Sequence, residues 1–157
     1  MNRPTSEEDA LPRAEEIPSK VRGILVTHGS MCFGMVDAVR KIAGVPEDAL
    51  IGISNAGRGP EELLASVAEV AGQTPAVIFT DLQTGSCALA ARFACRGPTG
   101  RRVIFGANLP MLLDFVFHRD LPLDQLVDRL LEKGRGAIRS FEPQEEDAQR
   151  DDRPPQS

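Results

Sequence analysis

Short apolar runs alternate with longer stretches of helical periodicity from Val21 onward. The apolar runs have the length and composition of buried strands, and they cover residues 23–28, 50–55, 76–81 and 101–107. The helical stretches cover residues 34–44, 60–72, 86–97, 108–120 and 123–134. Strands that alternate with helices form βαβ units, in which helices cover both faces of a parallel sheet. The alternation therefore predicts an α/β fold with a doubly wound, mostly parallel sheet.

Residues typical of helix ends support these boundaries. Gly44 follows the first helical stretch, where glycine is a favoured C-cap. Asn108 precedes another stretch, where asparagine is a favoured N-cap. Ser86 and Gly97 stand at the two ends of a third stretch, and we expect them to be its N-cap and C-cap.

The chain of 157 residues is long enough for one domain with a substantial core. The net charge of −5 resides in two acidic tails, residues 1–20 and 142–157, which are expected to be disordered. The domain between them, residues 21–141, is nearly neutral and has no Trp or Tyr. A nucleic-acid-binding surface is therefore not expected, because that function needs basic patches or aromatic stacking.

Cysteine usage and hydropathy bear on the compartment. Cys32, Cys87 and Cys95 are odd in number and lack metal-ligand spacing, so we expect reduced thiols rather than a disulfide framework. The first ten residues are polar and acidic, unlike a signal peptide, and no apolar run reaches the length of a membrane span. These observations predict a cytoplasmic protein.

Polar side chains stand where two of the predicted strands end. His28 closes the first strand and Asp81 closes the third. If these strands are neighbours, the carboxylate can accept a hydrogen bond from one imidazole nitrogen and leave the other as a nucleophile. Ser86 and the amides around Gly85 begin a helix, where unpaired N–H groups attract an anion. The sequence thus suggests a phosphohistidine site.

Each of these residues could instead have a purely structural role, and the spacing of the residues does not decide between the two interpretations. A histidine at a strand end often only packs, an aspartate there often closes a turn, and Ser86 alone can be an N-cap. The second histidine, His118, lies within a helical stretch and is expected to be exposed and without a chemical role.

Three other classes of α/β protein lack their motifs in this chain. A phosphoaspartate receiver domain has adjacent acidic residues after its first strand, where Thr27 and His28 stand here. A flavin-binding fold usually stacks aromatic side chains on the flavin, and none is available near the strand ends. A serine hydrolase has a G-x-S-x-G elbow, which is absent, and residues 29–34 lack the Lys-Ser/Thr of a phosphate loop.

Three motifs, in order, resemble those of one family. They are T-H-G at residues 27–29, D-L-Q-T-G-S-C at residues 81–87 and G-A-N-L-P-M-L at residues 106–112. With them, residues 22–141 resemble the IIA component of the mannose family of the bacterial sugar phosphotransferase system. The second motif departs from the family pattern D-x-x-G-G-S-P at two positions, with Thr84 for the first glycine of the pair and Cys87 for the proline.

The resemblance implies a protein-histidine phosphotransferase. His28 would accept a phosphoryl group from the phosphohistidine of the carrier HPr and pass it to a IIB component. Asp81 would hydrogen-bond the imidazole, and Ser86, with Gly85 and Thr27 of the same motifs, would bind the phosphoryl group. No cofactor or metal is implied, and the membrane is involved only indirectly, through IIC and IID subunits.

The family is dimeric, with a C-terminal strand that crosses to the partner's sheet as an antiparallel edge. Residues 136–142, which alternate apolar and polar side chains, would be that strand. Met31 and Phe33, just after His28, suit a transient contact with HPr, whereas Met35 is expected in the core.

The resemblance leaves two functional roles and one related subunit as alternatives. The carrier either feeds a sugar transporter or is a solitary regulatory protein whose phosphorylation state selects its partners. A related subunit that serves dihydroxyacetone kinase shares the fold and the early histidine, but the segment 108–112 argues against it. The sequence does not identify a sugar.

Overall fold

The computed structural model describes residues 20–97 and 100–143. The predicted tails, residues 1–20 and 142–157, lie outside this part except for residues 20, 142 and 143. The strands are β1 (Arg22–Thr27), β2 (Leu50–Ser54), β3 (Ala76–Thr80) and β4 (Arg101–Phe105). The helices are α1 (Met31–Ala43), α2 (Pro60–Ala71), α3 (Ser86–Ala94), α4 (Leu109–Phe117) and α5 (Leu123–Gly136).

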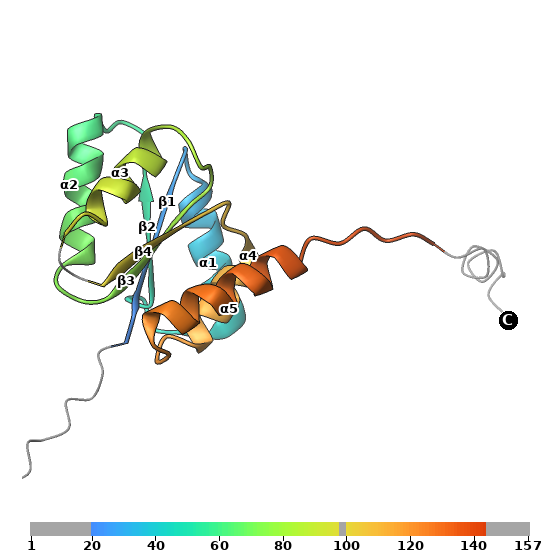
Figure 1. Ribbon diagram of the computed structural model, residues 1–157. Coiled ribbons are helices and arrows are strands. Elements are labelled where there is room, and N and C mark those ends of the chain that lie inside the picture. The colour runs from blue at the N-terminus through green and yellow to red at the C-terminus, as the bar shows by residue number, and fades with distance from the viewer. Residues whose placement is uncertain (1–19, 98–99, 144–157) are drawn as a thin grey trace, which may run out of the picture.

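The four strands form one parallel sheet in the order β2-β1-β3-β4 (Figure 1). The chain leaves β1 toward β2 on one side, and β3 then pairs with β1 on the other side. The gap between the carboxyl ends of β1 and β3 is therefore the topological switch point, where open α/β sheets bind their ligands.

Helices cover both faces of the sheet, as predicted. Helices α2 and α3 pack on one face, and α1, α4 and α5 pack on the other (Figure 1). Successive residues of β1 supply both cores, because side chains alternate across a strand. Leu25 belongs to the core beneath α1, α4 and α5, whereas Ile24 and Val26 belong to the core beneath α2 and α3.

Gly23 lies at a close contact between a helix and the sheet. A Cβ atom there would collide with the ring of Phe115 on α4 and lie 2.9 Å from Leu50 Cδ1. The Phe115 ring also contacts Phe79 of β3 edge-to-face, with ring centroids 5.3 Å apart. The missing side chain of Gly23 therefore allows α4 to pack directly on the middle of the sheet.

Two of the expected helix ends are confirmed. Gly44 adopts the left-handed conformation (φ 62°) and caps α1. Asn108 is the N-cap of α4, where its side-chain oxygen accepts a hydrogen bond from the backbone N–H of Met111 at 3.1 Å.

The ends of α1 and α3 differ from the prediction. Helix α1 begins three residues early, at Met31, and Gly34 lies within it. Its first turn is held by the hydroxyl of Thr27, which accepts from the N–H of Cys32 at 2.8 Å. Helix α3 ends at Ala94 with Cys95 as its C-cap, so Gly97 does not cap it.

The C-terminal strand is not formed in this single chain. Gly136 is the last residue of α5, and residues 138–143 are neither helix nor strand. They lead away from the domain in Figure 1. An edge strand that pairs only with another copy has no hydrogen-bonding partner within its own chain, so the antiparallel edge is absent from this sheet. None of the helices in the described residues is long and apolar enough to cross a bilayer.

Candidate functional site: a histidine–aspartate pair at the switch point

His28 lies directly after β1, at the edge of the sheet where β1 and β3 end. The two strands are neighbours, with Val26 opposite Thr80, so the residues that follow them lie close together. Gly29 turns the chain away toward α1 with a positive φ of 58°. The imidazole remains 41 % exposed, whereas the carboxyl group of Asp81 is only 11 % exposed.

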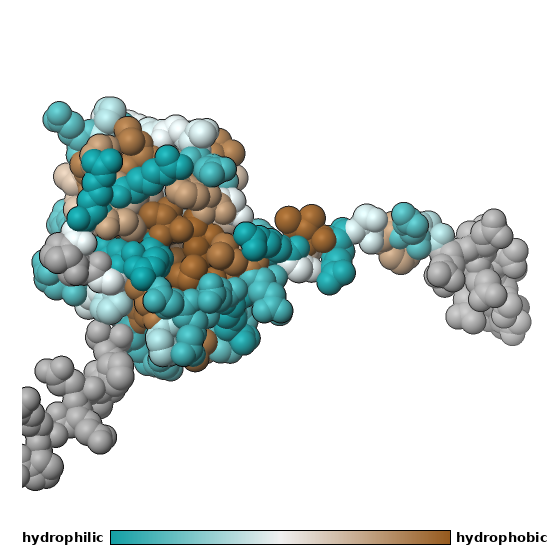
Figure 2. Space-filling model, viewed as in Figure 1, coloured by the Kyte–Doolittle hydropathy of each residue, from teal (hydrophilic) through white to brown (hydrophobic). Residues whose placement is uncertain are grey.

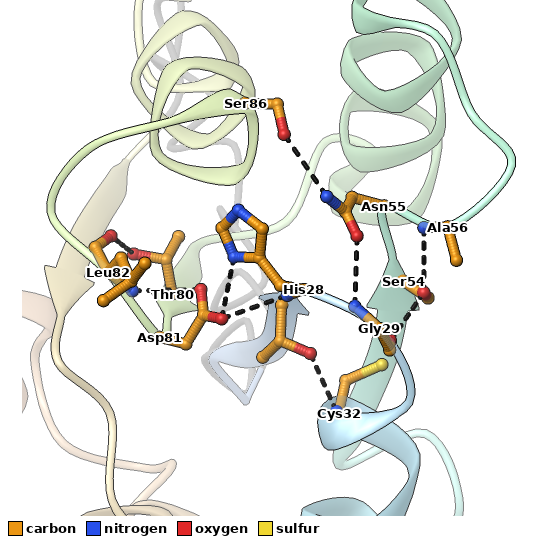
Figure 3. Close-up of polar contacts among 11 residues, drawn as sticks. His28, Gly29, Cys32, Ser54, Asn55, Ala56, Thr80, Asp81, Leu82 and Ser86 are labelled. Carbon is orange, nitrogen blue, oxygen red and sulfur yellow. Dashed lines mark hydrogen bonds and ion pairs between the residues drawn. The ribbon is translucent and has the colours of Figure 1, made fainter.

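Asp81 contacts His28 through one oxygen. Its Oδ2 accepts from the backbone N–H of His28 at 3.0 Å and lies 2.9 Å from ring Nδ1 (Figure 3). A carboxylate oxygen accepts hydrogen bonds, so Nδ1 carries the proton and Nε2 carries the free lone pair. The expected pairing of His28 with Asp81 is present in the structure, and it leaves Nε2 with a free lone pair.

The hydrogen bonds around Asp81 favour its ionised form. Burial alone would raise the pKa of this carboxyl group. The backbone and ring N–H groups of His28 and the N–H of Leu82 together hold the pKa of Asp81 below its ordinary value. The site therefore contains a fixed negative charge behind the imidazole.

Nε2 lies beside the start of α3. A Cβ atom on Gly85 would lie 3.5 Å from Nε2, so the glycine brings the backbone close to this nitrogen. Gly85 has φ 91° and is the N-cap of α3. The first N–H groups of a helix have no partner within it and carry partial positive charge, so this position suits an anion bound to Nε2.

Ser86 is the first residue of α3 rather than its N-cap, which corrects the prediction. Ser86 Oγ accepts from Nδ2 of Asn55 at a long 3.5 Å (Figure 3). Ser86 Oγ is the acceptor in this contact, so the contact does not use the hydroxyl proton of Ser86.

Thr27 has a different place from the one expected of a phosphoryl-binding residue. Its side chain is fully buried, and its hydroxyl accepts from the N–H of Cys32 at the start of α1. This geometry supports a role in holding the turn that carries His28.

Sequence reasoning missed two residues at the carboxyl end of β2, the last residue of the strand and the one after it. Ser54 Oγ donates to the carbonyl of Gly29 at 2.6 Å, and Asn55 Oδ1 accepts from the N–H of Gly29 at 3.1 Å. The signal was available in the sequence, because Ser54 and Asn55 are polar residues at the end of a strand that neighbours β1. Together they fix the turn after His28 from the side opposite Asp81.

Cys87 lies close to the His28–Asp81 pair. Nitrogen, oxygen and sulfur ligand atoms of His28, Asp81 and Cys87 lie within 4.8 Å of one another, the one such group within the described residues. Burial raises the pKa of the Cys87 thiol, and the charge of Asp81 raises it further. This environment disfavours the thiolate, which is the form of cysteine that binds metals.

The second histidine and the three cysteines noted in the sequence lie at positions where they cap a helix or pack in the fold. His118 is the C-cap of α4 and is half-buried rather than exposed, with Nδ1 donating to the carbonyl of Asp114 at 2.8 Å. The cysteines are free thiols, of which Cys32 and Cys87 are buried and Cys95 is half-buried.

These features define a class of protein: a doubly wound α/β domain that presents a carboxylate-oriented imidazole beside a helix N-terminus. Residues 23–131 match the family described as the PTS system fructose IIA component. The chain belongs to this family of the phosphotransferase system, which confirms the resemblance drawn from its motifs. No curated protein matches the chain.

Solved structures share the fold. The phosphotransferase system component EIIA from Streptococcus agalactiae is 24% identical, with a TM-score of 0.72 over 77% of this chain and 97% of its own. The mannose/sorbose-specific IIA subunit from Enterococcus faecalis is 25% identical, with a TM-score of 0.70 over 80% and 98%. The IIA protein associated with the fucose utilization operon of Streptococcus pneumoniae is 19% identical, with a TM-score of 0.61 over 78% and 94%.

Proposed function

We propose that the protein is a phosphoryl carrier of the phosphotransferase system, in which His28 accepts a phosphoryl group from phospho-HPr and passes it to a IIB component. The observation that carries this proposal is the contact between Asp81 and Nδ1 of His28, which leaves Nε2 free beside Gly85. The regulatory alternative would use the same phosphohistidine, and no contact among the described residues favours it.

The transfer step needs no exchange of protons with the protein. The N–P bond of the donor phosphohistidine breaks as a new bond forms between phosphorus and Nε2, and the electron pair of the old bond returns to the donor ring. The donor keeps the proton on its other ring nitrogen, and His28 keeps its proton on Nδ1. The positive charge that develops on the His28 ring then lies against the carboxylate of Asp81.

The phosphoryl oxygens would meet the start of α3. Ser86 Oγ can donate its free proton to one oxygen, and the backbone at Gly85 lies close enough to approach another. Such positioning and charge stabilisation account for most of what a protein contributes to phosphoryl transfer.

Apolar side chains beside His28 offer a docking surface for HPr and IIB in turn. Phe33 is 56 % exposed and Met31 is 50 % exposed in the first turn of α1, and Leu82, next to Asp81, is exposed as well. Met35 packs against the core as expected. Both partners must bring a histidine to the same Nε2, so one surface serves both contacts.

The open edge of the sheet supports a homodimer. Within the part of the chain that the structure describes, strand β4 pairs only with β3, and Figure 2 shows apolar side chains gathered between α3 and α5, where β4 forms the edge. Ile138 and Phe141, beyond α5, are 78 % and 82 % exposed. A segment with these side chains is suited to add an antiparallel strand to β4 of a second copy.

The free thiols and the carrier role fit the cytoplasm, with any membrane contact made through separate IIC and IID subunits.

The test is phosphorylation by phosphoenolpyruvate, enzyme I and HPr, followed by intact mass. We expect a gain of one phosphoryl group that is lost in His28→Ala and kept in His118→Ala, the matched control. A phosphorylated His28→Ala variant, or a wild type that gains no mass from a cognate HPr, would contradict the proposal.

A further inference from the structure

We propose that Asn55 is a phosphoryl-binding residue, whose carboxamide NH2 donates to an oxygen of the group carried on His28 Nε2. This inference rests on the proposed function. It adds a donor from β2, on the side of the imidazole opposite Asp81.

The backbone holds Asn55 level with His28. Thr27 of β1 is paired with Ser54 of β2, and the N–H of Asn55 donates to the carbonyl of Thr27 at 3.1 Å. Asn55 therefore extends the ladder between β1 and β2 by one residue, next to the point where His28 leaves β1. A half-buried side chain anchored in this way has little freedom to turn away.

The contacts of the side chain determine which way the carboxamide points. The N–H of Gly29 can only donate, so the atom 3.1 Å from it is the oxygen of Asn55. The NH2 group is then directed to the other side, toward Ser86 Oγ at 3.5 Å. Figure 3 shows this NH2 group and Ser86 bordering the space toward which the free edge of the His28 ring points.

The NH2 group has donor capacity to spare. It carries two N–H bonds, and the contact with Ser86 is near the upper limit for a hydrogen bond. A phosphoryl oxygen on Nε2 is a stronger acceptor because it is charged, so Asn55 and Ser86 would both turn their protons toward it. Asn55 forms and breaks no covalent bond in the transfer.

The test compares Asn55→Asp with Asn55→Ala in the rate of phosphorylation by phospho-HPr. Aspartate keeps the oxygen that accepts from Gly29 but replaces the donor with a negative charge. If Asn55 donates to the phosphoryl group, both variants slow transfer by about tenfold to a hundredfold, and the aspartate variant is at least as slow as the alanine variant. Gln73→Glu, the same change of an amide to an acid at an exposed site preceding β3, keeps the wild-type rate.

The outcomes separate this inference from the proposed function. An Asn55→Asp variant as fast as wild type, beside a slow alanine variant, would assign Asn55 only to holding Gly29 and overturn the inference. Wild-type rates in both variants would overturn it too. In either case phosphorylation of wild type on His28 leaves the proposed function standing, whereas its absence removes both.

Discussion

One oxygen of Asp81 holds His28 at two points, the backbone N–H at 3.0 Å and ring Nδ1 at 2.9 Å. The same contact fixes where β1 ends and which way the imidazole faces. The ring cannot rotate without removing a hydrogen bond from a carboxylate that is almost buried. Orientation of the nucleophile is therefore built into the packing of β1 against β3.

Replacing Asp81 by asparagine tests this orientation. The amide can still accept from His28, but it no longer holds a charge against the phosphorylated ring. We expect the rate of phosphoryl transfer in Asp81→Asn to fall by about a hundredfold or more, on the scale seen when the acid that orients a catalytic histidine is neutralised. Rapid-quench phosphorylation measures this rate. Asp37→Asn, in an exposed ion pair with Lys41, is the control, and equal rates in both variants would refute the assignment.

The lowered pKa of Asp81 predicts how the free energy of unfolding depends on pH. Its pKa is lowered in the folded protein, so the unfolded chain binds the extra proton first as the pH falls. The stabilisation is present above the unfolded pKa of about 3.9 and is lost as the pH falls through the folded pKa. Urea unfolding at several pH values should show the free energy of unfolding of wild type and Asp81→Asn converging toward low pH. A constant difference would contradict the prediction.

Gly23→Ala should destabilise the fold by about 1–3 kcal/mol, because the new methyl group collides with the ring of Phe115 in a packed core. Gly34→Ala is the matched control, since a Cβ atom there meets nothing within 4 Å. In the interior of α1 this second change should stabilise by about 0.5–1 kcal/mol. Chemical denaturation measures both. Similar effects from the two variants would show that the contact of α4 with β1 is not tight.

If the proposed docking surface binds HPr, a substitution in it should change the affinity for phospho-HPr without changing the rate of the transfer step. Phe33→Ser should raise the KM for phospho-HPr while leaving kcat nearly unchanged, because the exposed ring would contact the partner rather than the reacting atoms. Ile42→Ser changes an equally exposed apolar residue at the other end of α1 and should alter neither constant. An unchanged KM in Phe33→Ser would place the docking surface elsewhere.

The proposed homodimer predicts that self-association depends on the segment after α5. Wild type should have the mass of a dimer in light scattering, and the double variant Ile138→Asp, Phe141→Asp should shift to the monomer, because charged side chains would be buried against β4 of the second copy. Ile42→Asp should stay dimeric. A monomeric wild type at micromolar concentration would argue against the exchange of strands.

Much of the architecture was predictable from local pattern. Buried parallel strands are continuous apolar runs, so the four strands were found within two residues of their ends. Local chemistry identified the caps at Gly44 and Asn108 as well. The predicted caps of α3, Ser86 and Gly97, were wrong. Several residues near a helix end have suitable side chains, and packing selects among them.

The candidate site, like the architecture, was predictable from the sequence only in part. His28 and Asp81 were identifiable because each follows an apolar run, and the chemistry of an imidazole and a carboxylate limits what such a pair can do. That they touch depends on the strand order, since only the placement of β3 beside β1 puts Asp81 within 3 Å of the ring. The same order brings β2 to the other side of β1, which is why Asn55 became visible only in the folded chain.

The amino-acid sequence alone determined the element types, the two-faced α/β sheet and the candidate histidine, because these depend on periodicity and on side-chain chemistry at strand ends. The tertiary structure decided which nitrogen of His28 is free, that Thr27 is turned into the fold, and that Asn55 faces Ser86. Those properties depend on distances between segments far apart in the chain, and such distances are set by how the strands pair and how the helices pack on them.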